Sequence, residues 1–255
     1  MIDKWEELNS SYWNANCYVR ASDIESGNDI TYNSVVVPYV DKFVKMYADS
    51  NDRILDIGSG CGFLTNIISK TNNVVGIDIA DELVNYSRQL YPHISFQHKS
   101  IYSYLNSNEN FNICIATLVV HTLSSISDFF KVVRSLLLNN GYLMFIIPHP
   151  CFWIEKKISG FNKYRDNNIY ILPFNINSNN NYPAKMIYFH RTLSDYFNTA
   201  VNSEFEVLRI DELYESDSNL KKGYKSDLIA FILKKKMAGL PRFEPQSHIE
   251  DHFLL

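Results

Sequence analysis

A short apolar run that leads into three closely spaced glycines limits what this chain can fold into. The run is Ile54-Leu55-Asp56-Ile57, and the turn Gly58-Ser59-Gly60-Cys61-Gly62 follows before a helical pattern begins at Phe63. Because glycine has no Cβ, the backbone of such a turn can approach a ligand closely. The first turn of the next helix adds unpaired N–H groups and a favourable dipole. The pattern therefore predicts a buried strand, a ligand-binding turn and a helix.

Further runs rich in Ile and Val alternate with helical patterns along the chain. This alternation is typical of a doubly wound α/β sheet. Two runs in the last third, 205–214 and 228–235, are joined by a link too short for a helical crossover, so they are expected to pair antiparallel. We predict a mostly parallel seven-stranded sheet that ends in a C-terminal antiparallel hairpin. Its five parallel strands are expected at 53–57, 74–79, 94–98, 111–117 and 141–147.

The helix before the fifth strand is expected to be capped by Ser127 or Asp128 and to end at 139–141. Asp81 is expected to start an earlier helix that buries Leu83, Val84 and Leu90. Thr192 and Asp195 have the spacing of a capping box, which predicts a helix through about Val201.

The segments outside this sheet are rich in aromatic residues. We expect one domain over 1–236, in which an N-terminal helical segment (1–48) precedes the ligand-binding core (49–147). An insertion after strand five (148–191) follows, then the C-terminal helix and hairpin (192–236) and a loosely structured tail (237–255). A polar, asparagine-rich stretch at 175–181 is expected to be a mobile loop. Ligands bind at the carboxyl ends of the strands in such folds, and both aromatic segments can cover that edge.

Composition and charge narrow the class of protein. The chain has 255 residues, 46% of them hydrophobic, and a formal net charge of −4, which argues against a strongly electrostatic grip on nucleic acid. No apolar run approaches the roughly 20 residues that span a bilayer, and the start of the chain does not have the pattern of a signal peptide. The cysteines lack metal-ligand spacing, so we expect a cytoplasmic protein without a metal site. They are Cys17, Cys61, Cys114 and Cys151.

The spacing of the glycines separates two kinds of ligand. Dinucleotide folds need G-x-G-x-x-G, and the third glycine would fall at Phe63. The pattern present is instead D-x-G-x-G-x-G, in which Asp56 at the strand end can attract a cationic ammonium group. A ligand without a pyrophosphate is therefore favoured, and an NAD(P)-dependent oxidoreductase is the competing interpretation of the fold.

These residues resemble the class I methyltransferases that use S-adenosylmethionine (SAM), and further blocks of the chain extend the resemblance. One block is 74–79, which ends in Asp78-Ile79, and others are 111–118 and 136–147. In that family, the acid that ends the second strand binds both ribose hydroxyls, which implies this role for Asp78 and a place against the adenine for Ile79. The usual Asp after Phe111 is here Asn112. The resemblance implies SAM as cofactor and a cofactor-binding set of Asp56, Gly58, Ser59, Gly60, Gly62, Asp78, Ile79, Ser100, Ile101, Thr117 and Leu118.

The chain departs from the family after its third strand. Many members carry an acid there that bonds the adenine amino group, whereas this chain has His98-Lys99-Ser100. Ser100 is expected to supply a weaker hydrogen bond in its place.

The methyl acceptor is not identified by these motifs. The chain lacks the N/D-P-P-Y/F motif of enzymes that methylate amino groups, and Cys151 is interpreted as a buried thiol. His149, His190 and Tyr188 are the candidate catalytic residues around the insertion, and His121 is expected near the methionine tail of the cofactor. The aromatic segments resemble those of small-molecule methyltransferases, so we expect methyl transfer to O or N of a metabolite. The same motifs also fit an RNA or protein methyltransferase, or a noncatalytic SAM-binding partner subunit.

Overall fold

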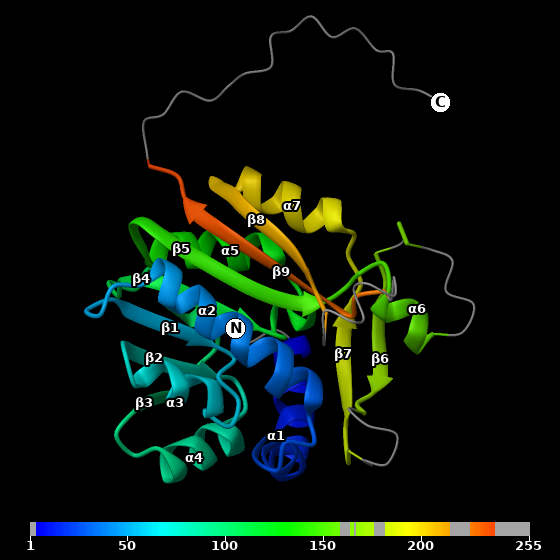
Figure 1. Cartoon of the computed structure of the whole chain (residues 1–255). Helices are drawn as coiled ribbons and strands as arrows, with labels where there is room; N and C mark the ends of the chain where they lie inside the picture. The colour runs from blue at the N-terminus through cyan, green and yellow to red at the C-terminus, as the bar shows by residue number, and fades with distance from the viewer. Residues whose placement is uncertain (1–3, 159–163, 166, 176–181, 215–224, 238–255) are drawn as a thin grey trace, which may run out of the picture.

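Seven strands form one sheet in the order β3-β2-β1-β4-β5-β9-β8 (Figure 1). The structure is a computed structural model and describes residues 4–158, 164–165, 167–175, 182–214 and 225–237. The first five strands are parallel, and β9 runs antiparallel to both β5 and β8. The predicted sheet and its C-terminal hairpin are therefore confirmed. The strands are β1 Arg53–Ile57, β2 Asn73–Asp78, β3 Ser95–His98, β4 Phe111–Thr117, β5 Leu137–Pro148, β8 Phe205–Leu213 and β9 Leu228–Lys235.

Helices cover both faces of this sheet. Alternate residues of each strand point to opposite faces, so Ile113 and Ile115 of β4 join one core cluster while Cys114 and Ala116 join the other. The first cluster includes helices α2 (Val37–Tyr47), α3 (Phe63–Ser69) and α4 (Asp81–Leu90). The second includes the short 3₁₀ helix η2 (Ile101–Tyr104), α5 (Ile126–Leu136) and α7 (Leu193–Asn202).

Helix α1 (Lys4–Glu25) buries both apolar and polar side chains, and its polar side chains join the core to the insertion. On the core side, Ser10 Oγ donates to the carbonyl of Ile79 at 2.8 Å. On the other side, the amide N–H of Ala184 donates to Asn16 Oδ1 at 2.9 Å. A π-helix, η1 (Tyr32–Val36), then leads into α2, where Pro38 stands in the first turn. The N-terminal segment is helical, as predicted.

The insertion after β5 forms a small layer of its own. It holds α6 (Trp153–Lys157) and an antiparallel pair, β6 (Ile169–Pro173) with β7 (Lys185–Phe189). Figure 1 shows this pair beyond the end of β5, beside α1. Two ion pairs, Lys156–Asp227 and Glu155–Lys225, join α6 to the residues just before β9. Most of the expected loop, residues 176–181, lies outside the described residues.

Three expectations about helix ends are wrong. Helix α5 ends at Leu136 rather than at 139–141, because Leu137 already pairs with Phe111 of β4 and so starts β5. Its N-cap is Ser125, whose Oγ accepts from the N–H of Asp128. Leu90 is 44% exposed, because it lies in the last turn of α4 beyond the core. The capping box of α7 is present as predicted.

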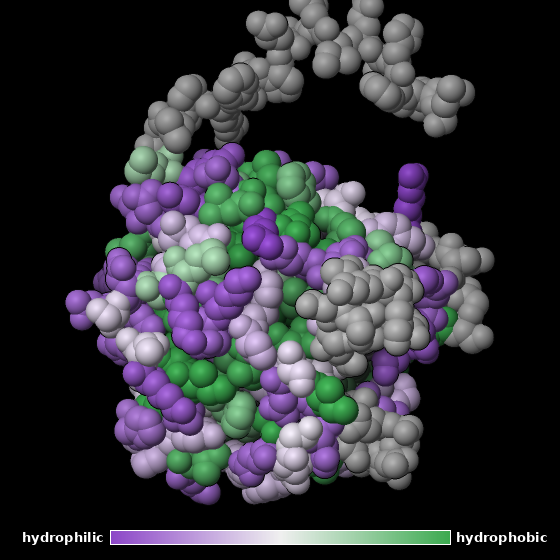
Figure 2. All heavy atoms as spheres, in the orientation of Figure 1, coloured by the Kyte–Doolittle hydropathy of each residue, from purple (hydrophilic) through white to green (hydrophobic). Residues whose placement is uncertain are grey.

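The surface mixes polar and apolar residues, with hydrophobic residues gathered near β8 and α7 (Figure 2). Phe197, Val201, Leu208 and Ile210 of these elements are 37–44% exposed. Among the helices that the structure describes, none is long and apolar enough to cross a membrane. Apart from residue 237, the expected tail lies outside the described residues.

Candidate cofactor and acceptor site

A cavity of about 410 Å³ lies at the carboxyl ends of the central strands. One wall is built from the ends of β1, β2 and β4 and from the glycine turn, and the opposite wall from α1, α6 and the β6–β7 layer. Helix α1 presents one face to the cavity, because its lining residues recur every three, four or seven positions. They are Glu6, Asn9, Trp13, Arg20 and Ile24.

The glycine turn takes a backbone conformation that other residues rarely adopt. Gly58 and Gly60 have φ of 71° and 55°, in the left-handed region. A Cβ on Gly58 would lie 2.1 Å from Cγ2 of Val119, whereas a Cβ on Gly60 would meet no atom within 4 Å. Gly58 therefore lets β1 pack against the segment after β4, and Gly60 leaves room for a ligand. Gly62 also has a positive φ, and Ser59, whose Oγ is buried without a hydrogen-bond partner among the described residues, lies between Gly58 and Gly60 in the cavity wall.

Asp56 places a buried carboxylate under this turn. Its Oδ2 accepts a hydrogen bond of 2.6 Å from Thr65 Oγ1, while its Oδ1 has no partner in the described part of the chain. Burial, with a smaller contribution from the nearby Asp78, raises the pKa of Asp56 to about 6 against the lowering effect of the Thr65 hydrogen bond. A cationic ligand group at Oδ1 would relieve this cost.

Asp78 ends β2 and lies across from the turn. Its Oδ2 accepts from the N–H of Gly60 and its Oδ1 from the N–H of Ala80, both at 2.9 Å. Burial raises the pKa of this carboxyl even though these N–H groups lower it. Since each carboxylate oxygen has two lone pairs, both oxygens can also accept from ligand hydroxyls. Ile79 follows directly and lines the cavity.

Ser100 does not have the predicted place in the cavity. Its Oγ donates to Oε1 of Glu6 and accepts from the N–H of Tyr102, so the hydroxyl caps η2 and holds α1. The lining residues here are Glu6, Lys99 and Ile101. Glu6 therefore places a carboxylate in the part of the cavity lining beside β3. The sequence after β3 itself has no acidic residue there.

The segment after β4 forms the floor of the cavity. Thr117 ends the strand, and Leu118 follows with φ of 58°, a strained conformation for a residue with a side chain. Its N–H donates to the carbonyl of Ile146 at 2.8 Å. Both residues line the cavity, as the sequence led us to expect of cofactor-binding residues.

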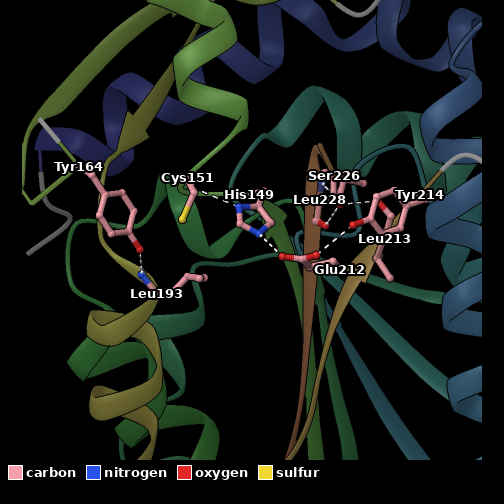
Figure 3. Close-up of polar contacts among 9 residues, drawn as sticks. All are labelled: His149, Cys151, Tyr164, Leu193, Glu212, Leu213, Tyr214, Ser226 and Leu228. Carbon is pink, nitrogen blue, oxygen red and sulfur yellow. Dashed lines mark hydrogen bonds and ion pairs between the residues drawn. The ribbon is translucent and has the colours of Figure 1, made fainter. Parts of the chain in front are cut away.

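His149 is buried and is not among the described residues that line the cavity, although the sequence made it a catalytic candidate. Its Nδ1 accepts from the backbone N–H of Cys151 at 3.2 Å, and its Nε2 lies 3.2 Å from Oε1 of Glu212 (Figure 3). Burial lowers the pKa of His149 against the opposing effect of Glu212. Both ring nitrogens are thus engaged, and His149 joins β5 to β8. Cys151 is only partly buried, so its interpretation as a buried thiol is wrong.

His190 and Tyr188, the other two candidates, lie behind the cavity wall. His190 is 1% exposed, and its Nε2 lies 2.9 Å from the carbonyl oxygen of Tyr164. Tyr188 is also 1% exposed, and its ring packs against Trp153 and His121 with centroid distances of 5.1 and 5.7 Å. Neither residue is among the described residues that line the cavity.

Of the histidines that the structure describes, His121 is the one that lines the cavity. It is 2% exposed, and its Nδ1 has no hydrogen-bond partner among the residues described. Burial, with a smaller contribution from the nearby Arg191, lowers the pKa of His121 to about 3. Asn9 of α1 also lines the cavity, and its Nδ2 donates to Thr122 Oγ1 at 3.0 Å while its Oδ1 has no partner in the described chain.

Comparison with known proteins shows which family the chain belongs to. A family described as "Methyltransferase domain" matches residues 48–182, which is more than half of the chain and includes the glycine turn. The chain belongs to this family. Together with the sheet order and the glycine turn, the match makes the protein a class I SAM-dependent methyltransferase.

Individual relatives agree with this assignment. The methyltransferase 235L of Invertebrate iridescent virus 6 is 29% identical over 103 residues, or 39% of this chain. An uncharacterized methyltransferase of Schizosaccharomyces pombe is 35% identical over 71 residues, or 27% of this chain. These matches span only 33% and 27% of the two relatives' own lengths. In structure, a SAM-dependent methyltransferase of Listeria monocytogenes superimposes with a TM-score of 0.65 at 18% identity, over 77% of this chain and 96% of that one.

The described residues of the methyltransferase fit a SAM molecule in chemical terms. SAM carries an ammonium group, a sulfonium, two ribose hydroxyls and an adenine. The cavity offers the unpartnered carboxylate oxygen of Asp56, the carboxylate of Asp78, and the apolar side chains of Ile79 and Ile101. The sequence missed Glu6 and Arg20, because no local pattern indicates which face of α1 meets the core.

Proposed function

We propose that this methyltransferase transfers a methyl group from SAM to an oxygen or nitrogen atom of a small-molecule metabolite. The observation that carries the proposal is one cavity that joins the glycine turn to an aromatic wall. Its volume of about 410 Å³ is within the range of small-molecule pockets. RNA and protein substrates are favoured less. A nucleotide or side chain of such a substrate would have to enter a cavity that α1 and α6 partly cover.

In this proposal, each residue on the cofactor side of the cavity binds a different group of SAM. Asp56 pairs with the ammonium, and Asp78 accepts from the ribose hydroxyls through charge-assisted hydrogen bonds. Ile79 and Ile101 pack against the adenine. Glu6, rather than Ser100, accepts from the adenine amino group, because Glu6 lines the cavity while the Ser100 hydroxyl is bonded to it.

The acceptor occupies the part of the cavity between the segment after β4 and the insertion. Trp13, Trp153, Phe174 and Met186 line this part, which suits a flat and partly apolar molecule. The ring of Trp13 lies edge-on to Phe174 at 5.1 Å, so α1 and the insertion form a continuous apolar wall. This wall excludes water and holds the acceptor in line with the reactive carbon.

SAM supplies a methyl group on a positively charged sulfur, so the chain has to align the acceptor and receive its proton. As the bond between the acceptor atom and the methyl carbon forms, the carbon–sulfur bond breaks and the acceptor loses a proton. His121 is the group in the cavity wall that would take up this proton, because its Nδ1 has no hydrogen-bond partner among the described residues and burial keeps the imidazole neutral. The same lowered pKa makes His121 a weak base, so it would take the proton only as the acceptor atom becomes more acidic on methylation.

His149, His190 and Tyr188 have other roles in this proposal. Tyr188 packs against the His121 ring, and His190 packs against Tyr188 at 6.0 Å between centroids. These two residues position His121 rather than touch the acceptor. His149 connects β5 to β8.

The test uses SAM with a labelled methyl group and a panel of phenols, amines, a short RNA and a peptide as acceptors. We expect label in a phenol or amine, and we expect His121→Gln to lower that turnover at least tenfold while S-adenosylhomocysteine (SAH) binds as before. His93→Gln is the control, because His93 is exposed. Label only in the RNA or peptide would contradict the small-molecule proposal. Tight SAM binding without transfer to any probe would favour the noncatalytic subunit.

A further inference from the structure

Arg191 is a buried cation that forms no ion pair within the described part of the chain. It is 9% exposed, and its Nη2 donates to the carbonyl oxygens of Leu123 and Ser124 at 2.6 and 3.0 Å. Its Nη1 has no hydrogen-bond partner among the described residues. The nearest acid along the chain, Asp195, accepts from the N–H and the Oγ1 of Thr192 instead, at 2.7 and 2.8 Å. Because a buried charge without a counter-ion is costly, this guanidinium calls for an anion that the described chain does not supply.

The guanidinium lies behind the acceptor part of the cavity. Leu123, whose carbonyl oxygen it binds, lines the cavity together with His121 and Thr122. Arg191 itself is not among the described residues that line the cavity. It would therefore act on a bound molecule through its electric field rather than by contact. Such a field is stronger across packed protein than in water, because the dielectric constant is lower.

A second cation lies on the insertion side of this part of the cavity. Lys157 of α6 lines the cavity, and its Nζ lies 5.6 Å from the centre of the Trp153 ring, one helical turn earlier. Lys157 is exposed and forms no ion pair with the residues that the structure describes, whereas its neighbours Glu155 and Lys156 do. The acceptor part of the cavity thus has an unpaired cation at its rim and a buried one behind its wall.

We propose that the methyl acceptor is a small aromatic carboxylate, whose ring packs against Trp13 and Trp153 and whose carboxylate binds Lys157. Arg191 favours the ionised acceptor without touching it. At the other end of the cavity, the carboxylates at the glycine turn favour the cationic cofactor. The cavity therefore has opposite charge at its two ends, and each reactant is attracted to its own end.

The carboxylate binds in this proposal, and a hydroxyl or amino group on the ring reacts. The bond from that oxygen or nitrogen atom to the methyl carbon forms while the carbon–sulfur bond of SAM breaks, and the same atom loses its proton. This inference deepens the proposed function and rests on it.

The test measures the preference for an ionised acceptor as the ratio of kcat/KM between each acid and its carboxamide. The probes are hydroxy- and amino-substituted benzoates and naphthoates, each paired with its carboxamide, together with SAM that carries a labelled methyl group. The two members of a pair share the ring and the nucleophile, so the ratio reports mainly the charge. We expect the acids to be preferred by about tenfold or more, and we expect this preference to fall as salt is added.

Two variants test the two cations separately. Lys157→Met should lower the preference for the acid by about twofold to fivefold, since an ion pair at an exposed rim is weak. Arg191→Gln should lower it by about threefold to tenfold, because its charge acts through a medium of lower dielectric constant. The control is Lys131→Met, which breaks an exposed ion pair with Asp128 on α5 outside the cavity and should leave the preference unchanged.

Equal turnover of the acids and the carboxamides would overturn the inference, as would a preference that neither variant changes. A merely structural role of Arg191 would lower the turnover of both members of a pair equally and leave their ratio unchanged. Absence of label from every acid, with a chain that binds SAM, would also overturn the inference. Failure to bind SAM, or label only in RNA or a peptide, would instead overturn the proposed function.

Discussion

At the scale of single residues, the electrostatics of Asp56 connect sequence to ligand binding. Asp56 supplies a buried carboxylate whose Oδ1 has no hydrogen-bond partner among the described residues, and burial raises its pKa. The spacing of Asp56, the glycines and Asp78 was sufficient to predict that these residues lie together, because they belong to one strand–turn–helix unit and the strand beside it. Local geometry determines where they lie.

The affinity for SAH should depend on pH through Asp56. The pKa of this carboxyl is about 6 in the free chain, and pairing with an ammonium lowers it in the complex. Binding below pH 6 must therefore release a proton, and the dissociation constant should rise by up to tenfold per pH unit as the pH falls. Calorimetry between about pH 5 and 7.5 measures this slope.

Methylthioadenosine controls for Asp78 in that measurement, because it retains the ribose and lacks the ammonium. Its affinity should vary less with pH than that of SAH. Asp56→Asn should bind SAH more weakly and with a flatter pH profile. An equal pH dependence of the two ligands would show that Asp56 does not meet the ammonium.

Gly60 should matter to the ligand more than to the fold. Gly60→Ala places a methyl group in the space left for SAM, and its φ of 55° adds a strain of about 1 kcal/mol. Gly27 is the matched control, because its φ is 76° and a Cβ there also meets no atom within 4 Å. Both variants should lose similar stability in thermal unfolding, and only Gly60→Ala should lose SAH affinity. Equal affinities for the two variants would remove Gly60 from the cofactor site.

Other residues of the site could not be predicted from local sequence. Ser100 follows β3 as the family pattern requires, yet Glu6 from a helix 94 positions earlier occupies the lining and bonds to it. His121 was expected near the cofactor's methionine tail, and it lines the cavity. Its Nδ1 has no hydrogen-bond partner within the described residues, and the sequence could not predict this because it depends on tertiary packing. His149 was misjudged because Glu212 comes from a strand that pairs with β9, and the sequence does not show this contact.

At the scale of elements, apolar periodicity located every strand of the main sheet, while tertiary pairing decided where elements end. The parallel strands fall within two residues of the prediction, except for the start of β5. That start is four residues early because Leu137 pairs with Phe111, and the polar run Asn139-Asn140 then lies within the strand. The β6–β7 pair was not predicted, since both strands lie in an insertion without a clear alternation.

Helix α7 should depend on its capping box. Thr192 Oγ1 accepts from the N–H of Asp195 at 3.1 Å, and Asp195 Oδ2 accepts from the N–H of Thr192 at 2.7 Å. Thr192→Ala, which removes the N-cap side chain, should lower the free energy of unfolding by about 0.5–2 kcal/mol, measured by denaturant titration. SAH affinity should not change, because α7 packs on the other face of the sheet from α1. A loss of SAH affinity without loss of stability would contradict this separation.

At the scale of the whole molecule, the site exists because distant segments close over one edge of the sheet. Residues from α1, the glycine turn, the segment after β4 and the insertion share one cavity. The sequence predicted that the first and last of these would cover the ligand edge, but it could not predict their contacts with each other, such as Trp13 with Phe174. A cytoplasmic location and the domain boundaries stay predictions.

The central claim is that the glycine turn and the acids around it bind SAM, and calorimetric titration of the purified chain tests it most directly. The ligands are SAM, SAH, NADH and NADPH. The account predicts micromolar or tighter binding of SAM and SAH, loss of affinity in Asp78→Ala, and no binding of the nicotinamide cofactors. Binding of NADH or NADPH, or of neither class of ligand, would contradict it.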